Sequence, residues 1–391
     1  MTRMQPRSSA VVAAALGALL AGCPGCGDDA VDPGDGSSVE SQTLLLTVGA
    51  SGLSDPVSFV VPPDALSLHL TARAPGATGK LAFELSQDGQ LRVSYQTPAT
   101  ADDALLSVHD ELAWGTPAST AGLARSPGGS WEVKLRHLGG ALPAPVPVLA
   151  VWRRAGPPER GEPRGRLGVS LVLVGRDGDS AAEAAARRAL DGAANLLDLP
   201  IDVAAVVHVD GAAAAPFATV DVSGGADAAG MRALFAQPLG LPALGTLPLF
   251  VVPRLTETTP TGGLDVFGSS GGIPIPVASG GAHGGVAVSA AALALDRRTG
   301  TIAIAHELGH ALGLLHTSEP SGGAHDHLTS TPECTSARDS DGSGTVLPEE
   351  CSGAGAENLM FWALGSAAPT LSAEQHAILN RSPLLVKWPA P

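Results

Sequence analysis

Hydrophobic and polar positions alternate in short runs through residues 42–152, which is the pattern of half-buried β-strands. Turn residues separate the runs, and Asp88-Gly89 between two of them is a typical hairpin dipeptide. The runs are Phe59–Val61, Leu66–Leu70, Leu81–Leu85, Leu91–Tyr95 and Trp131–Leu135. Because no helical periodicity interrupts them, we predict an all-β sandwich or jelly roll that acts as a binding module, an intramolecular chaperone or a spacer.

From residue 167 the pattern changes to strands that alternate with helices. The nearly continuous apolar run Leu167–Val174 is typical of a strand covered on both faces. A helix is expected to open at the capping-box pattern of Ser180 and Glu183, and a second one to span about Thr299–Leu312. This half of the chain is therefore predicted to be an α/β (α+β) domain. Its further strands are expected at Ile201–Val209, Leu247–Val252 and Val286–Val288.

The N-terminus has the pattern of an export signal. Arg3 and Arg7 precede an apolar run, Ala10–Ala21, that is too short to span a bilayer but fits a signal-peptide core. The run ends in Leu-Ala-Gly-Cys, which resembles the bacterial lipoprotein box. That resemblance implies a lipid on Cys23 and a place in the cell envelope, at the outer membrane or cell surface. An ordinary secretory signal with an incidental cysteine is the alternative.

Composition divides the chain further. The stretch 23–41 is rich in Gly, Asp, Ser and Pro, as expected of a flexible tether, and 153–166 is rich in Arg, Pro and Gly, as expected of an exposed linker. Cleavage of that linker would release the domain behind it, although a simple connection is the plainer interpretation. The segments are a signal peptide (1–22), a tether (23–41), a β-sandwich accessory domain (42–152), a linker (153–166) and a catalytic domain (167–391).

The charge balance narrows the classes of function. A formal charge of −15 disfavours a nucleic-acid binder, which needs a basic face for the phosphate backbone. Only 16% of residues are charged, and 49 glycines and 32 prolines accompany them. This composition suits loop-rich secreted domains better than helical bundles.

The strongest chemical pattern lies in the second predicted helix, which contains His306-Glu-Leu-Gly-His310 and continues to Gly313 and His316. His306 and His310 are four residues apart and leave the same helix face, so both imidazoles can bind one metal ion. Gly313 interrupts the helix where a sharp turn would bring His316 to the same ion. Three imidazoles leave the fourth position of tetrahedral zinc open, as catalytic zinc sites require.

Glu307 lies between the two helical histidines, placed to reach a water molecule on the zinc but not to complete the ligand set. Zinc lowers the pKa of such a water and polarises a scissile carbonyl. Glu307 would take the proton of the water and pass it to the leaving amine. Neither incidental histidines nor a structural zinc site explains this glutamate, so we predict a zinc-dependent endopeptidase.

The residues from His306 to His316 carry a motif that resembles that of the metzincin zinc proteases. Asn358–Trp362 resembles the Met-turn of that family, in which a methionine lies beneath the zinc. The resemblance implies that Met360 is an apolar floor for the ligands and not a ligand. It also implies that an extended protein or peptide substrate pairs with an edge strand above the zinc, for which Val286–Val288 is the candidate.

Among the metzincins, the chain is most similar to pappalysin-like members over about Leu167–Leu385. Two departures stand out: Phe361-Trp362 replace an expected acidic residue and tyrosine, and the single tyrosine, Tyr95, lies in the other predicted domain. Stabilisation of an oxyanion would then fall to zinc, a histidine or a backbone amide. The matching residues are Gly309–Thr317, Thr331–Cys334, Cys351 and Leu371–Gln375.

Two of the four cysteines, Cys334 and Cys351, lie in the same C-terminal stretch and are expected to form a disulfide outside the cytoplasm. Between them, twelve residues follow the pattern of an EF-hand calcium loop. A calcium loop without flanking helices and a plain polar turn are both consistent with this pattern. The candidate Ca²⁺ ligands are Asp339, Asp341, Ser343, Thr345 and Glu350.

Two rival functions remain open. One is a non-enzymatic surface lipoprotein that binds a partner through its β-sandwich and carries a degenerate protease domain. The other is a zinc hydrolase that acts on something other than peptides. The intact Glu307 disfavours the first rival, and Met360 disfavours the second. His325 and His327 could form a second metal site, but a solvated loop explains them more simply.

Overall fold

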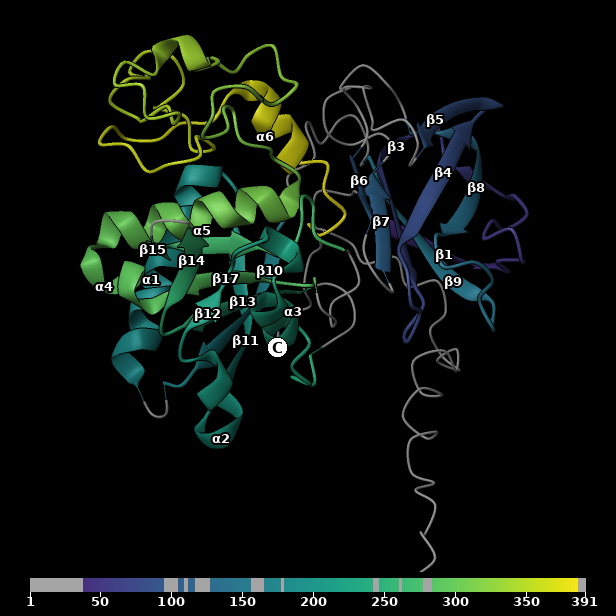
Figure 1. Ribbon diagram of the computed structural model, residues 1–391, viewed down its shortest axis with the longest axis horizontal. Coiled ribbons are helices and arrows are strands. Elements are labelled where there is room, and N and C mark those ends of the chain that lie inside the picture. The colour runs from purple at the N-terminus through teal and green to yellow at the C-terminus, as the bar shows by residue number, and fades with distance from the viewer. Residues whose placement is uncertain are drawn as a thin grey trace, which may run out of the picture. The chain divides into compact units, whose positions relative to one another are not determined.

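The structure is a computed structural model that describes residues 38–94, 105–108, 112–116, 127–155, 165–176, 179–241, 246–259, 262–276 and 283–385. Several predicted features lie outside these residues. They are the signal peptide, Cys23, most of the tether, Tyr95 and the centre of the linker. Among the described residues, the helices lack the combination of length and hydropathy that a membrane span needs. The described part of the chain is rich in β-structure and contains several sheets together with some helices (Figure 1).

The described residues between 38 and 154 form two antiparallel sheets that share one apolar core. The strand orders are β1-β9-β3-β7-β6 and β2-β8-β4-β5. Leu68, Phe83 and Trp131 are almost completely buried in the shared core, and such inward residues produce the alternating sequence pattern. The strands are β1 Ser38–Leu46, β2 Val57–Val61, β3 Ala65–Arg73, β4 Leu81–Gln87, β5 Gln90–Ser94, β6 Leu105–Val108, β7 Leu112–Thr116, β8 Gly129–His137 and β9 Val146–Arg154.

The hairpin between β4 and β5 turns at the expected dipeptide. Asp88 and Gly89 have φ angles of +50° and +78°. A two-residue hairpin of this type needs positive φ at both central positions, and glycine adopts that conformation without steric cost. The prediction of a hairpin at this dipeptide is therefore confirmed.

Strands β1 and β9 extend past the boundaries that composition predicted. Ser38–Ser41 belong to β1 and not to a tether, and Arg153 and Arg154 belong to β9 and not to an exposed linker. The strands extend this far because β1 and β9 pair with each other along their whole length. Glu40 of β1 also binds the guanidinium of Arg154 at 3.0 Å. Arg153 is fully buried and donates a hydrogen bond to the carbonyl oxygen of Asn380 at 2.7 Å. Both arginines therefore belong to a paired strand, and Arg153 is not accessible to a protease.

Residues 165–385 contain a five-stranded sheet with the order β11-β10-β13-β17-β16. The first four strands are parallel, whereas β16 pairs antiparallel with β17. Every residue of β10 is buried, as its nearly continuous apolar run predicted, and every residue of β13 is buried as well. The strands are β10 Leu167–Val174, β11 Ile201–Val209, β13 Leu247–Val252, β16 Gly268–Ser270 and β17 Val286–Ser289, and a separate small sheet contains β12 Val220–Asp221, β14 Leu255–Thr259 and β15 Gly262–Val266.

The edge strand of this sheet differs from the predicted one. Val286–Val288 lie in β17, which is covered on its outer side by β16. The three residues of β16 are Gly-Ser-Ser, which have no hydrophobic pattern and lie in a glycine-rich stretch. Hydrophobic periodicity therefore could not predict the strand that forms the edge of the sheet.

Helices cover both faces of the sheet. Helices α1, α4 and α5 pack on one face, with α5 running across the strands (Figure 1). The cluster that contains Phe217, Met231 and Phe235 packs on the other face. This arrangement of layers agrees with the α/β prediction. The helices are α1 Ser180–Leu197, α2 Gly211–Ala214, α3 Ala229–Phe235, α4 Ala290–Leu295, α5 Arg297–Leu312 and α6 Ala373–Leu379, with 3-10 turns at Ala215–Phe217, Gly225–Asp227 and Ser336–Arg338.

Helix α1 begins with a different cap from the predicted capping box. The capping side chain is that of Asp179, which accepts a hydrogen bond from the backbone N–H of Ala182 at 2.9 Å. Asp is as good an N-cap as Ser, so the helix begins with Ser180 inside its first turn. Glu183 does not bond back to the cap and instead binds Arg187 at 2.8 Å.

The segment 313–372 contains little regular structure and is held by a small cluster around the predicted disulfide. Cys334 and Cys351 are bonded, with their Cα atoms 5.6 Å apart, which confirms the pairing. The bond closes a loop with a sequence separation of 17, and such loops contribute on the order of 3 kcal/mol. Val346 and Phe361 are buried against the two cysteines.

Candidate metal centre

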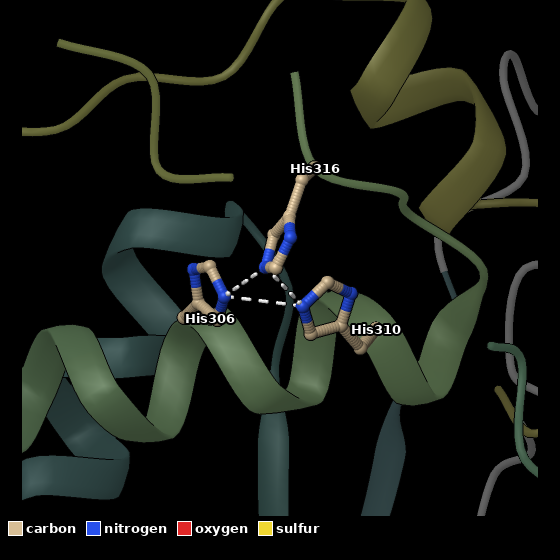
Figure 2. A group of neighbouring side chains, drawn as sticks. All are labelled: His306, His310 and His316. Carbon is tan, nitrogen blue, oxygen red and sulfur yellow. Dashed lines mark hydrogen bonds between the residues drawn. The ribbon is translucent and has the colours of Figure 1, made fainter. Parts of the chain in front are cut away.

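Helix α5 and the turn after it bring three histidines together (Figure 2). The Nε2 atom of His306 lies 3.1 Å from that of His310 and 3.2 Å from that of His316, and the last two are 3.0 Å apart. Gly313 ends the helix with a φ of +115°, in the left-handed region that favours glycine. The reversal of the chain at Gly313 is what returns His316 to the helix face.

Each imidazole also bonds an acceptor through its Nδ1 atom. A backbone carbonyl can only accept, so Nδ1 carries the proton in the two rings that bond one, and their Nε2 atoms keep their lone pairs. The acceptors are the Leu359 carbonyl for His306 (2.8 Å), the Leu314 carbonyl for His310 (2.7 Å) and the Glu319 carboxylate for His316 (3.1 Å).

Burial keeps the helical imidazoles neutral. Desolvation lowers the pKa of His306 to about 4 and lowers that of His310 well below its ordinary value. Neutral rings with converging lone pairs repel one another unless a cation lies among them. Zn–N bonds of 2.0–2.1 Å at tetrahedral angles separate the nitrogens by about 3.3 Å, close to the separations found here. The donor set therefore fits a metal ion such as zinc.

Glu307 lies beside this group and lines a cavity next to His306. Its side chain is buried, and the loss of solvation raises the pKa of its carboxyl group to about 8. The space for this side chain exists because position 268 in the edge strand β16 is glycine. A Cβ atom on Gly268 would lie only 2.8 Å from Oε1 of Glu307. The side chain of Glu307 thus lies between helix α5 and the edge strand β16.

Met360 packs beneath the helix that carries His306 and His310. It is fully buried, and a Cβ atom on Gly309 would lie 2.7 Å from its sulfur. Glycine inside the helix therefore lets the methionine approach the helix backbone. The carbonyl of Met360 accepts a hydrogen bond from the N–H of Thr317 at 3.0 Å. The turn at Met360 thereby supports the segment that leads away from His316.

A cavity of about 410 Å³ opens beside His306 and Glu307. The hairpin of β14 and β15, the edge strand, helix α5 and the segment after Leu359 form its walls. The lining is mainly apolar, with Glu257 and Asp265 as the acidic exceptions apart from Glu307. Apolar lining residues include Leu264, Phe267, Ile302, Phe361, Trp362 and Leu364.

The loop 339–350 brings three of its five candidate calcium ligands together. Carboxylate oxygens of Asp339, Asp341 and Glu350 lie within 4.8 Å of one another. The hydroxyl of Ser343 instead donates to the carbonyl oxygen of Thr345 at 3.1 Å. The three carboxylates form a group that could bind a hard cation.

The histidines that follow the third candidate ligand form no comparable group. Within the described ranges, His325 and His327 belong to no cluster of three potential ligands. Asp326 between them is buried and accepts hydrogen bonds from Thr331 Oγ1 at 2.6 Å and from the N–H of Leu328 at 3.1 Å. Asp326 therefore closes a local turn.

Sequence reasoning missed several residues that shape this site. The carbonyl groups of Leu314 and Leu359 have no side-chain signature, so no pattern could have identified them. Gly268 was indistinguishable from its glycine-rich surroundings. Glu319 could have been found, because it follows His316 by three residues and carries a carboxylate suited to an imidazole N–H.

The sequence matches no profile of a known protein family, and no curated protein matches it. Similar solved structures include metalloproteinase-II from Bacteroides fragilis, with 12% identity, a TM-score of 0.32 and coverage of 59% of this chain and 61% of that one. The cyanophage Pam1 capsid has 17% identity, a TM-score of 0.19 and coverage of 31% and 84%, respectively. This chain thus spans about three fifths of the proteinase. Such low TM-scores carry no argument, so function is argued from the histidine site.

Proposed function

We propose that this chain is a zinc-dependent endopeptidase that hydrolyses proteins or peptides outside the cytoplasm. The proposal rests on three imidazole Nε2 atoms within 3.2 Å of one another, next to a buried glutamate and an open cavity. His306, His310 and His316 would hold the metal. When bound, zinc supplies Lewis-acid chemistry that polarises a carbonyl group and makes water more acidic.

In this proposal Glu307 is the general base. It accepts a proton from the attacking water and passes it to the amine that leaves. Burial disfavours the ionised form of its carboxyl group, which makes the carboxylate a stronger proton acceptor. Hydrolysis of peptides by the full chain that stops with a chelator and returns with zinc would support the proposal, and hydrolysis that persists without metal would contradict it.

The substrate backbone would pair with β16, which replaces Val286–Val288 as the candidate edge. Strand β16 is the last strand of the sheet, and its Gly268 lies directly beside Glu307. An extended peptide added to this edge would pass next to the three histidines. A substrate side chain could then enter the cavity, whose mainly apolar lining favours an apolar residue.

Filling the cavity is expected to change which peptides are cleaved. Ala303 lines it from helix α5, so Ala303→Phe should lower kcat/KM about 10-fold or more for a peptide with a large apolar side chain, and less for a matched peptide with alanine. Ala291→Phe, on the exposed side of α4, is the control. Equal losses for both peptides, or none, would contradict this assignment of the cavity.

We also propose Ca²⁺ as a second cofactor, bound by Asp339, Asp341 and Glu350. A ligand that binds only the folded state stabilises that state, by about 2.7 kcal/mol when its free concentration is a hundred times Kd. Calcium should therefore raise the Tm of the wild-type chain but not that of Asp341→Asn. The control is Glu349→Gln, at an exposed neighbouring position, whose Tm calcium should raise as much as that of the wild type. If the Tm of the wild type were the same with and without calcium, the proposed calcium site would be refuted.

Sequence motifs lead us to propose that the protease is pappalysin-like and that a lipid on Cys23 anchors it at the outer membrane or cell surface. Cleavage within residues 156–164 would release the protease from this anchor. An intact mass of the mature chain without acyl groups would count against the anchor.

A further inference from the structure

The three imidazoles differ in the group that holds their Nδ1 atoms. His306 and His310 bond neutral backbone carbonyls, whereas His316 bonds the carboxylate of Glu319 at 3.1 Å. His316 is also the only one of the three outside helix α5, since it follows the helix end at Gly313. The helix backbone therefore does not fix this ring as it fixes the other two.

We propose that Glu319 is a positioning residue that orients the ring of His316 and strengthens it as a metal donor. A carboxylate that accepts the Nδ1–H proton fixes both the tautomer and the rotation of an imidazole. Its negative charge also raises the basicity of the opposite nitrogen, Nε2, which faces the other two histidines. The proposal rests on the metal site proposed above and adds a fourth side chain to it.

The backbone around Glu319 is well anchored. Its N–H donates to the carbonyl oxygen of Ala324 at 2.9 Å, and its own carbonyl accepts from the N–H of Gly322 at 2.8 Å. The carbonyl of Pro320 accepts from the N–H of Val346 at 2.8 Å. Val346 is buried against the Cys334–Cys351 disulfide. The carboxylate is therefore presented to His316 from a turn that is tied to a covalently closed segment.

An ordinary surface ion pair is the competing explanation for this contact. The side chain of Glu319 is 45% exposed, and exposed pairs contribute little to folding stability. The two explanations differ in what they predict for the metal. If Glu319 positions His316, its removal changes metal affinity while unfolding of the metal-free protein stays nearly unchanged. A surface ion pair without this role would change neither property appreciably.

The test compares Glu319→Ala and Glu319→Gln with the wild-type full chain. Zinc affinity is measured by competition with a chromophoric chelator, and ligand geometry by the visible absorption of the Co²⁺-loaded protein. We expect Glu319→Ala to bind zinc roughly 10–100-fold more weakly. Glu319→Gln should lose less, because its amide oxygen still accepts from Nδ1 but carries no charge. Glu333→Gln, at an exposed position of the same segment, should match the wild type.

The outcomes separate this proposal from the proposed function. Wild-type zinc affinity and an unchanged Co²⁺ spectrum in both Glu319 variants would overturn the role of Glu319 and leave the metal site intact. A wild-type chain that binds no stoichiometric zinc would overturn the site and the role together. Thermal unfolding in the presence of chelator shows whether each variant folds. If Glu319→Ala does not fold, the affinity and spectrum of Glu319→Gln decide the question.

Discussion

Glu307→Gln is expected to lower kcat/KM for peptide hydrolysis by roughly two to four orders of magnitude while the protein keeps its zinc. The amide has nearly the same shape and fits the space left by Gly268, but it cannot accept a proton from water. Since Glu307 is not in the group of converging Nε2 atoms, zinc content should not change. Steady-state kinetics together with metal analysis on the same preparation measures both properties.

The control for this variant is Glu333→Gln, which removes the same charge at an exposed position. It should retain wild-type kinetics. If Glu307→Gln kept wild-type kcat/KM, another group would have to accept the proton. If it lost its zinc, the glutamate would belong to the ligand set, which contradicts the roles assigned here.

His316→Ala is expected to abolish stoichiometric zinc binding and, with it, peptide hydrolysis. Only His306 and His310 would remain, and two imidazoles leave a tetrahedral zinc site half open. The loss of affinity should exceed the roughly 10–100-fold typical of residues that act through a ligand. Equilibrium dialysis against buffered zinc, followed by metal analysis, measures this loss directly.

His327→Ala is the matched control, because His327 is an exposed histidine on the same segment and lies outside the histidine group. It should bind one zinc ion per chain, like the wild type. Stoichiometric zinc in His316→Ala would show that the metal does not need the third imidazole. That result would remove the geometric basis of the account.

Local patterns in the sequence predicted much of the fold and the centre of the site. Alternating residues such as Phe83 and Leu85 identified strands because they share one buried face. The nearly continuous apolar run Leu167–Val174 identified β10, an inner strand of the parallel sheet, because both of its faces are covered. The spacing of His306 and His310, with Gly313 as a helix stop, was sufficient to predict that three histidines meet.

Features that depend on contacts between distant residues were not predictable in this way. Ser38 and Arg154 pair across more than a hundred residues, so composition alone could not show that β1 and β9 extend to these residues. The edge strand at Gly268–Ser270 exists through its pairing with β17, because its own residues have no strand pattern. The acceptors that hold the imidazoles are mainly carbonyl groups, which every residue carries.

Peptide-bond hydrolysis by this chain, with zinc held by His306, His310 and His316 and with Glu307 as base, is the function proposed above. Its most direct test is incubation of the zinc-loaded full chain with a mixed peptide library, beside Glu307→Gln with equal zinc content. New amino termini are identified by mass spectrometry. The account predicts new amino termini with the wild type and none above background with the variant. Zinc-loaded wild-type protein that generates no new amino termini, or equal cleavage by both proteins, would contradict it.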